Sequence, residues 1–316
     1  MIDDVGANDP TVYIPTLTGG DGLRRCLDTL AAQTASAEVV VADNGDGDGC
    51  AEMLADEFPA VRRIGFGRNL GFGRALNRAI AEHGDGPIIL LNDDAVAEPD
   101  FVKSLVADSG PGRLVAAVML NAEDRRRIDS AGVVVDQTLM AFDYLSGLPV
   151  ERLAGAGPPL GPTGGAALYD RALFEAVGGF DERIFLYYED VDLALRMRLQ
   201  GGECVLAPGA RAVHGYSQTL GPRTGRKYAM TGWSRGYLLR RYGIMDSPSA
   251  VAQVLCREAV VCAGQIADDH TTAGLTGRIR GWRDAGGLPR RDIPHPQLTT
   301  LSIGRALALR RKRHAT

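Results

Sequence analysis

The sequence predicts an α/β fold built on a central, mostly parallel sheet, and three observations favour it. Short apolar and β-branched segments alternate with helical segments from residue 11 to about residue 120. The links between them are short and often contain Gly, Asp or Asn. Polar residues directly follow the strands, as at Asn92-Asp93-Asp94. Repeated strand–helix units form right-handed parallel sheets, and ligands lie beyond the carboxyl ends of such strands.

The expected elements of the first 120 residues follow one another in regular order. Strands are expected at 11–15, 38–42, 61–66, 88–91 and 114–120. Helices are expected at 21–33, 50–58, 71–83 and 99–108. The stretch 121–161 is first charged and then rich in Gly and Pro. It predicts an irregular excursion with one or two extra strands, a natural place for substrate specificity.

Regular structure returns in the second half of the chain. A strand at 163–169, a helix at 171–177, a mostly buried helix at 189–200 and a strand at 204–207 are expected, with 210–214 leading into a loop. Helices at 227–242 and 250–266 follow. The length allows one large domain or two small ones, and we expect one domain over residues 1–245 followed by a helical, basic extension over 246–316.

Composition limits the class of protein. The 316 residues are 45% hydrophobic, and 35 Lys and Arg against 39 Asp and Glu give a net charge of −4, which does not suggest nucleic-acid binding. The five cysteines (26, 50, 204, 256 and 262) are scattered and predict buried free thiols in a reducing compartment. The acidic N-terminus does not resemble a signal peptide, and no apolar run approaches the ~18–20 residues of a membrane span, so a cytoplasmic location is expected.

The C-terminal end is basic on an otherwise acidic protein. From residue 277 only Asp284 and Asp292 are acidic. The basic residues are Arg278, Arg280, Arg283, Arg290, Arg291, Arg305, Arg310, Arg311, Lys312 and Arg313. A solvated tail accounts for this composition, and contact with anionic lipid heads or an anionic acceptor is the functional alternative.

Two adjacent carboxylates, Asp93 and Asp94, follow the expected buried strand at 88–91. Neighbouring acids repel each other and lose hydration, and a divalent cation with phosphate ligands would relieve both costs. A solvated turn after the strand is the alternative, and this segment alone leaves both open.

Asp43 follows the second strand and is expected at the same edge of the sheet as Asp93-Asp94. The run DNGDGDG looks like a calcium loop, but an EF-hand starting at Asn44 would need an acid where Ala55 stands. A nucleotide site in which Asp43 accepts hydrogen bonds from a base or ribose is the preferred interpretation, with an Asx turn as the alternative.

The glycine-rich turn at 65–73 follows the third strand and lacks a dinucleotide fingerprint. It predicts a tight turn that admits a ligand closely, with Arg68 near phosphates and Asn69 as a polar anchor.

A second acidic cluster, Glu189, Asp190 and Asp192, opens the buried helix expected at 189–200. The helix dipole favours acids there, so solvated acids at a helix start explain them without function. In a nucleotide-dependent transfer, one carboxylate must instead take the proton of the attacking hydroxyl, and it must stay unpaired to do so. Taken alone, His214 is expected to be an ordinary surface or core histidine. It would have a function if it bound the same metal ion as Asp94.

Together these segments resemble inverting glycosyltransferase family 2, of the GT-A (Rossmann-like) fold, and more narrowly its bacterial rhamnosyltransferase-like branch. The matching segments are Pro15-Thr16, ADNGDGDG at 42–49, GRNLGFGRALNRAI at 67–80, LLNDDAVAEPDF at 90–101, IDSAG at 128–132, the stretch 161–201 and His214. Order and spacing hold over about 11–243. The resemblance implies a nucleotide-binding half at about 10–120 and an acceptor half at about 121–245.

The resemblance also implies residue roles. Donor contacts are expected from Pro15, Thr16, Asp43, Asn44, Arg68, Asn69, Asn92 and Asp93. Asp94 and His214 would hold a divalent metal, Asp190 would be the general base, and Gly164, Gly165 and Glu189 would meet the acceptor. Two features depart from the family pattern. Asn92 replaces the first acid of its D-x-D signature, and Thr16-Leu17-Thr18 stands where it has Thr-Tyr-Asn.

The implied reaction is a single displacement that needs Mn²⁺ or Mg²⁺ and inverts the anomeric configuration. It would move L-rhamnose from dTDP-rhamnose, as nucleotide-sugar co-substrate, to a hydroxyl of a cell-envelope glycan or lipid-linked acceptor. A UDP-hexose or UDP-galactofuranose donor stays open within the class. Peripheral contact at the inner face of the cell membrane through the basic C-terminus is also expected, and a homodimer is left open.

Three functions from other classes are disfavoured. A non-catalytic nucleotide-binding scaffold would not need Asp94, Asp190 and His214 together. A nucleotidyltransferase would need a phosphate clamp near the first strand, where only Arg24 and Arg25 stand. An NAD-dependent enzyme is disfavoured because the first strand lacks the fingerprint.

Overall fold

The computed structural model describes residues 9–47, 49–214 and 224–293. Among these residues, nine strands form one mixed sheet in the order β3-β2-β1-β4-β10-β6-β11-β5, with β7 on β6. Its strands are β1 (Thr11–Thr16), β2 (Glu38–Asp43), β3 (Arg62–Gly65), β4 (Ile88–Leu91), β5 (Ala95–Ala97), β6 (Arg113–Asn121), β7 (Ile128–Ser130), β10 (Ala166–Tyr169) and β11 (Glu203–His214).

The predicted α/β class is confirmed, and the parallel part of the sheet is its first half. Strands β3, β2, β1 and β4 run parallel, whereas β10 is antiparallel to both β4 and β6. Strand β11 is parallel to β6 and antiparallel to the short edge strand β5. Because β10 follows the long excursion and not a helical crossover, it can enter the sheet in the opposite direction.

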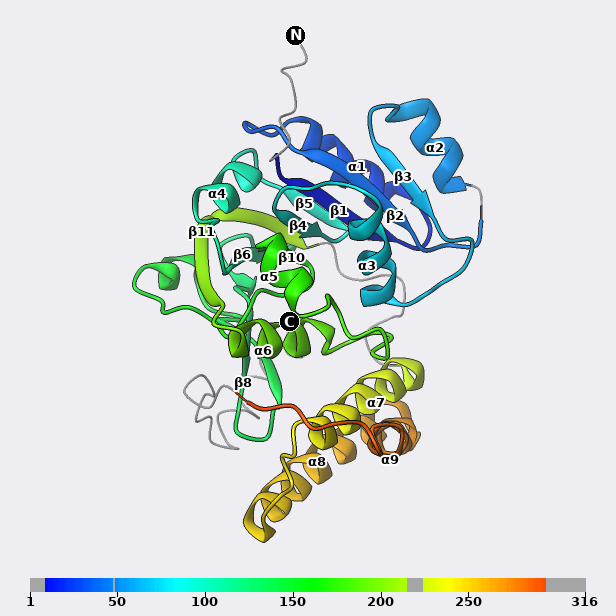
Figure 1. The fold of residues 1–316 in the computed structure, drawn as a ribbon, viewed down its shortest axis with the longest axis vertical. Helices are drawn as coiled ribbons and strands as arrows, with labels where there is room; N and C mark the ends of the chain where they lie inside the picture. The colour runs from blue at the N-terminus through cyan, green and yellow to red at the C-terminus, as the bar shows by residue number, and fades with distance from the viewer. Residues whose placement is uncertain (1–8, 48, 215–223, 294–316) are drawn as a thin grey trace.

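Helices cover both faces of the sheet, as Figure 1 shows. Helices α1 (Asp21–Ala31), α2 (Gly49–Glu57) and α4 (Phe101–Ala107) share one hydrophobic cluster. Helices α3 (Phe72–Glu82), α5 (Arg171–Ala176), α6 (Glu189–Leu199) and α7 (Gly225–Arg241) contribute to the other. Alternate strand residues divide between the clusters, with Val12 and Ile14 in the first and Tyr13 in the second.

The excursion at 121–161 contains β7, a separate hairpin of β8 (Val133–Val135) and β9 (Ala141–Asp143), and a 3₁₀ turn at Val150–Leu153. The sequence predicted one or two extra strands there. The prediction did not include β5, and it placed the end of the strand at 204–207 too early. In the structure β11 continues to His214 through an irregularity between Leu206 and Arg211, next to Pro208-Gly209.

The C-terminal extension consists of α8 (Pro248–Asp269) and α9 (Ala273–Asp284), which pack with α7 below the sheet in Figure 1. Helices α7 and α9 meet backbone to backbone, because a Cβ at Gly236 would collide with the Arg278 carbonyl and one at Gly281 with the Trp233 carbonyl. Glycines four residues apart on both helices permit this approach. The sequence did not predict α9, which it treated as the beginning of a tail.

Several arginines of the predicted solvated tail have internal partners, which corrects that prediction for the described part. Arg278 is buried and pairs with Glu258, and Arg291 pairs with the buried Asp181 and Asp192. A second correction concerns the cysteines. Cys256 is exposed on α8, whereas the other four are buried as predicted.

Candidate functional site

Three strands of the parallel half end at one edge of the sheet, as the sequence predicted. Thr16 of β1 pairs in register with Asp43 of β2, and β4 runs alongside β1 into Asn92-Asp93-Asp94. The Thr16 hydroxyl donates a 2.6 Å hydrogen bond to Asp93 Oδ2. Burial raises the pKa of Asp93 to about 6 together with the negative charge of Asp94, while the Thr16 bond acts in the opposite direction. This edge therefore concentrates negative charge that is partly removed from water.

Asp43 has a partner that the sequence did not reveal. Its buried Oδ2 accepts from Arg63, with Nε at 2.8 Å and the second guanidinium nitrogen at 2.7 Å. Its Oδ1 accepts a hydrogen bond from the Gly45 backbone amide at 3.1 Å. This bond forms the Asx-type turn that the sequence offered as the alternative to a nucleotide contact. Arg63 comes from β3, and nothing local in the sequence distinguishes it from the neighbouring Arg62. A base contact by Asp43 would have to coexist with these bonds or replace one.

Asn44 joins the β2 edge to the glycine-rich turn. Its side-chain amide donates to Asn69 Oδ1 at 3.2 Å and to the Gly71 carbonyl at 3.1 Å, and its Oδ1 accepts from the Leu70 amide at 2.7 Å. These bonds use both donor hydrogens of Asn44, so it acts here by shaping the turn. Arg68 is exposed on the same turn.

The glycine-rich turn also contacts the segment that precedes α6. The Phe72 amide donates to the Phe185 carbonyl at 2.9 Å, and a Cβ at Gly71 would press on the same carbonyl. Tyr187 and Tyr188 then adopt left-handed backbone conformations, with φ of 71° and 69°. Such conformations cost non-glycine residues roughly 1–3 kcal/mol each and concentrate at functional sites. The strained pair leads directly into Glu189-Asp190.

Asp190 is half-buried at the start of α6 and is held by backbone amides. Its Oδ2 accepts from Gly164 at 3.1 Å and its Oδ1 from Val191 at 2.8 Å. Among the described residues Asp190 has no ion-pair partner. Burial raises the pKa of Asp190, and the two backbone hydrogen bonds oppose that rise. A carboxylate with a raised pKa and no neutralising cation is suited to accept a proton.

Glu189 is only 6% exposed, and its Oε2 finds no hydrogen-bond partner in the described part of the chain. Its own burial raises its pKa, and the charge of Asp190 raises it further. The two carboxyl groups therefore resist being ionised together.

One glycine dipeptide connects the two acidic clusters. Gly164 donates to Asp190, and the Gly165 carbonyl accepts from the Asn92 amide at 3.0 Å. A Cβ at Gly165 would approach the Asn92 side chain, and one at Gly164 would touch Phe72 and Asp190. Residues that are 98 positions apart in the sequence, Asn92 and Asp190, are thereby brought to one place.

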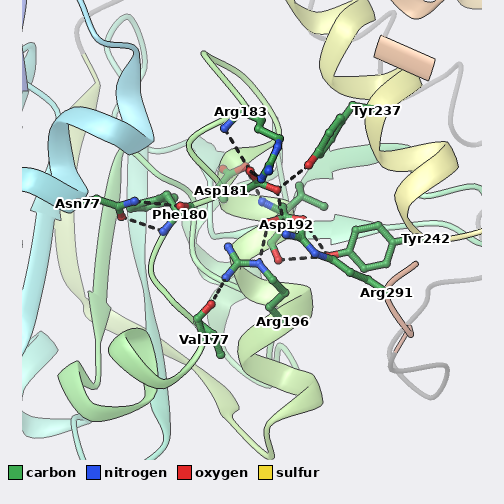
Figure 2. A network of polar contacts seen from close by, with 12 residues as sticks. Asn77, Val177, Phe180, Asp181, Arg183, Asp192, Arg196, Tyr237, Tyr242 and Arg291 are labelled. Atoms are coloured by element: carbon green, nitrogen blue, oxygen red, sulfur yellow. Dashed lines mark hydrogen bonds and ion pairs between the residues drawn. The ribbon is translucent and has the colours of Figure 1, made fainter. Parts of the chain in front are cut away.

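Asp192 lies on the opposite side of the same helical turn, within the network of Figure 2. It is completely buried, and it accepts from Arg196 at 2.8 Å, from the Tyr242 hydroxyl at 2.9 Å and from Arg291. Arg291 also donates to Asp181 at 2.8 Å. Two guanidinium groups thus neutralise Asp192, and the second comes from the C-terminal arm beyond α9.

Of the predicted metal ligands, Asp94 immediately precedes β5 and His214 ends β11, the strand that pairs with β5. His214 is the last residue of β11, and its backbone pairs with Ala95, the residue after Asp94. The His214 side chain lies outside the described part of the structure. Within that part, no group of three His, Cys, Asp or Glu side chains is arranged to hold a metal ion.

Comparison with known proteins decides the family. The model of glycosyl transferase family 2 matches residues 11–178, more than half of the chain. The chain belongs to glycosyl transferase family 2. This match covers β1 to α5 and therefore includes Asp43, the Asn92-Asp93-Asp94 edge and the Gly164-Gly165 dipeptide.

Curated relatives include bacterial rhamnosyltransferases. An N-acetylglucosaminyl-diphospho-decaprenol L-rhamnosyltransferase of Mycobacterium tuberculosis is 31% identical over 238 residues, 67% of this chain and 77% of that protein. The rhamnosyltransferase WbbL of Escherichia coli is 25% identical, over 64% of this chain and 83% of that protein. This family-2 member is therefore a glycosyltransferase of the bacterial rhamnosyltransferase-like type.

Solved structures support the fold. A mannosyltransferase of Pyrobaculum calidifontis, solved with GDP-Man and Mn²⁺, superposes with a TM-score of 0.55 at 19% identity, over 99% of this chain and 86% of that chain. GalNAc-T7, solved with UDP, GalNAc and Mn²⁺, gives 0.59 at 15% identity, over 79% of this chain and about half (52%) of that chain. These glycosyltransferases share the GT-A architecture, which confirms the predicted fold.

Proposed function

We propose that this glycosyltransferase moves L-rhamnose from dTDP-rhamnose to a hydroxyl group of a cell-envelope glycan or lipid-linked acceptor, with inversion at the anomeric carbon. The observation that carries the mechanism is the position of Asp190. It is half-buried, has no cation partner among the described residues, and is joined by Gly164-Gly165 to the edge that ends in Asn92-Asp93-Asp94. The names of the rhamnosyltransferase relatives support the choice of donor sugar.

On the donor side, the residues at the carboxyl edge of the sheet would bind the nucleotide. Asp43 and Thr16 stand at the ends of adjacent strands, where a base and ribose would lie beyond the sheet. Arg68 is exposed on the turn that Asn44 and Asn69 shape, and its charge would favour the diphosphate. Pro15 precedes Thr16 on β1 and would contribute backbone contacts only.

The residues at this edge fit a divalent cation. The raised pKa of Asp93 reports two neighbouring carboxylates that burial and mutual repulsion disfavour, and a cation would relieve both. A carboxylate and an imidazole are suitable ligands for Mn²⁺, and the backbone of His214 lies beside Ala95, next to Asp94. Asp94 and His214 would hold the ion. When bound, it would neutralise charge on the leaving diphosphate.

On the acceptor side, Asp190 would take the proton from the acceptor hydroxyl as that oxygen attacks the anomeric carbon. The bond from the anomeric carbon to the diphosphate breaks on the opposite face, which inverts the configuration. The amides of Gly164 and Val191 fix the direction of the carboxylate. Glu189, buried beside it, would keep the local charge low by staying protonated, because burial raises its pKa.

A donor screen tests the proposal. The protein is incubated with dTDP-rhamnose, UDP-glucose, UDP-galactofuranose and GDP-mannose, each with Mn²⁺, Mg²⁺ or EDTA. Thermal stabilisation and released nucleotide are the readouts. We expect dTDP-rhamnose to stabilise the protein in the presence of metal and not in EDTA. The variant Asp94→Asn should lose this metal-dependent stabilisation, and Asp100→Asn, an exposed acid before α4, should keep it.

The other outcomes are equally informative. Metal-dependent stabilisation by a UDP-sugar alone would replace the donor and keep the reaction class. Nucleotide binding without turnover on any glycan acceptor, in wild-type protein, would favour a non-catalytic scaffold.

A further inference from the structure

The outward side of α8 is apolar and carries no charge over four turns. Leu255 is 57% exposed, Val260 40% and Ile266 38%. The other exposed residues between positions 252 and 267 are Ala252, Gln253, Cys256, Ala259, Ala263, Gly264 and Ala267. Surface helices of globular proteins normally show the opposite pattern, with apolar residues inward and charges outward.

The charged residues of this stretch face the protein. Glu258 is buried and accepts from Arg235 of α7 at 2.7 Å and from Arg278 of α9. Arg257 pairs with the buried Asp136 of the turn that joins β8 to β9. Helix α8 therefore has its amphipathic pattern reversed. Its polar side holds the helix to the body of the protein, and none of the residues that the structure describes covers its apolar side.

The composition of α8 is that of a lipid-contacting helix. It has 22 residues and a mean hydropathy of 1.3 in its most apolar window, of which 17% is buried inside the protein. It is the one helix of the described chain that is long and apolar enough to cross a membrane by length and composition. The sequence prediction found no such run because Arg257 and Glu258 interrupt it.

We propose that the outward side of α8, defined by Leu255, Cys256, Ala259, Val260, Ala263 and Ile266, rests on a lipid bilayer with anionic head groups. The helix lies along the surface and does not cross the bilayer, because crossing would strip Arg257 and Glu258 of their partners. This inference does not depend on the donor or on Asp190, and so it goes beyond the proposed function.

The positive charge of the C-terminal region favours an anionic lipid surface as the partner of α8. Arg280 and Arg283 are exposed on α9, which packs against α8, and the sequence beyond residue 293 adds four arginines and one lysine without an acid. At the end of α8, Asp268 accepts a hydrogen bond from the Tyr228 hydroxyl and Asp269 accepts one from the Thr271 hydroxyl. A second copy of the chain carries the same exposed Arg280 and Arg283, and like charges repel, so it is a poorer occupant than an anionic surface.

Vesicle flotation of the full-length protein tests the proposal. Vesicles of phosphatidylcholine with 30% phosphatidylglycerol are compared with phosphatidylcholine alone. The variants Leu255→Glu and Val260→Glu place a charge on the outward side, and Val106→Glu, at a similarly exposed residue of α4, is the matched control. We expect wild type and Val106→Glu to float with the anionic vesicles. The α8 variants should lose at least about tenfold in partitioning, with unchanged melting temperatures.

Light scattering in solution completes the design. Wild-type protein that fails to float with either vesicle overturns the proposal, as does equal flotation of Val260→Glu and wild type. A stable dimer that Val260→Glu dissociates, without flotation, would assign the surface to a second copy instead. Equal flotation on both vesicles would overturn the requirement for anionic lipid.

Discussion

Asp190 and Asp192 lie in the first turn of α6, two positions apart, yet their surroundings are opposite. Asp192 is completely buried and neutralised by Arg196 and Arg291. Asp190 receives only backbone amide hydrogen bonds from the described residues. A buried carboxylate with its own cations holds structure together, because removing either partner leaves a buried charge. A carboxylate without them remains free to exchange a proton.

The buried side of α6 also connects the C-terminal arm to the candidate site. Arg291 lies 99 residues from Asp192 in sequence and 110 from Asp181, and it connects both to the arm beyond α9, as Figure 2 shows. Its backbone amide also donates to the Arg241 carbonyl of α7 at 2.7 Å. The side of α6 that carries Asp192 is thus held by the C-terminal region. The side that carries Asp190 faces Gly164 and the sheet edge.

The largest effect on stability is expected from Asp192→Asn. The variant leaves Arg196 without its buried counter-charge and Arg291 with Asp181 alone, and such a loss costs about 3–5 kcal/mol. Urea unfolding monitored by circular dichroism measures it. Unchanged stability would mean that the two sides of α6 do not differ in the way described.

A smaller loss is expected from Arg291→Gln, because Asp192 keeps Arg196 and Tyr242, and Asp181 keeps Tyr237. The loss of hydrogen bonds to two carboxylates should cost about 1.5–3 kcal/mol. The neighbouring Arg290→Gln is a matched control, since Arg290 pairs with the exposed Asp246 and such pairs contribute less than about 1 kcal/mol. Equal effects of the two substitutions would contradict a specific role for Arg291.

The smallest effect is a change in pH dependence with Glu189→Gln. Burial and the charge of Asp190 raise the pKa of Glu189, so the folded protein holds a proton there that the unfolded chain releases. Stability from this group is complete below the ordinary glutamate pKa and falls as pH rises through the raised value. Melting temperatures from pH 4 to pH 8 should therefore decline less in Glu189→Gln than in wild type. Parallel profiles would mean that Glu189 is not perturbed.

The sequence predicted the elements that depend on local pattern. Strand–helix alternation and short links located β1 to β4. Because the carboxyl ends of parallel strands lie at one edge of a sheet, Asp43 and Asp93 were predicted to lie at the same edge. It also predicted that Glu189 and Asp190 open a buried helix, as they do in α6. These features follow from residues close in sequence and from the topology of parallel sheets.

Long-range partners could not be predicted in the same way. The Arg63–Asp43 pair, the contact of Arg291 with Asp192 and the inward direction of Glu258 depend on which elements pack together. Periodicity shows that a residue is polar, but not whether its partner is water or a distant side chain. For the same reason part of a basic segment was predicted as solvated although Arg278 and Arg291 form buried ion pairs.

The most direct test of Asp190 as general base is the turnover of Asp190→Asn at saturating donor and acceptor, with donor affinity and melting temperature measured on the same protein. We expect a loss of about 10²–10⁴-fold in kcat, the usual effect of removing a general base, with donor affinity and stability preserved. Turnover within a few-fold of wild type would contradict it. So would a large loss of stability, because Asp190 would then be a structural carboxylate like Asp192.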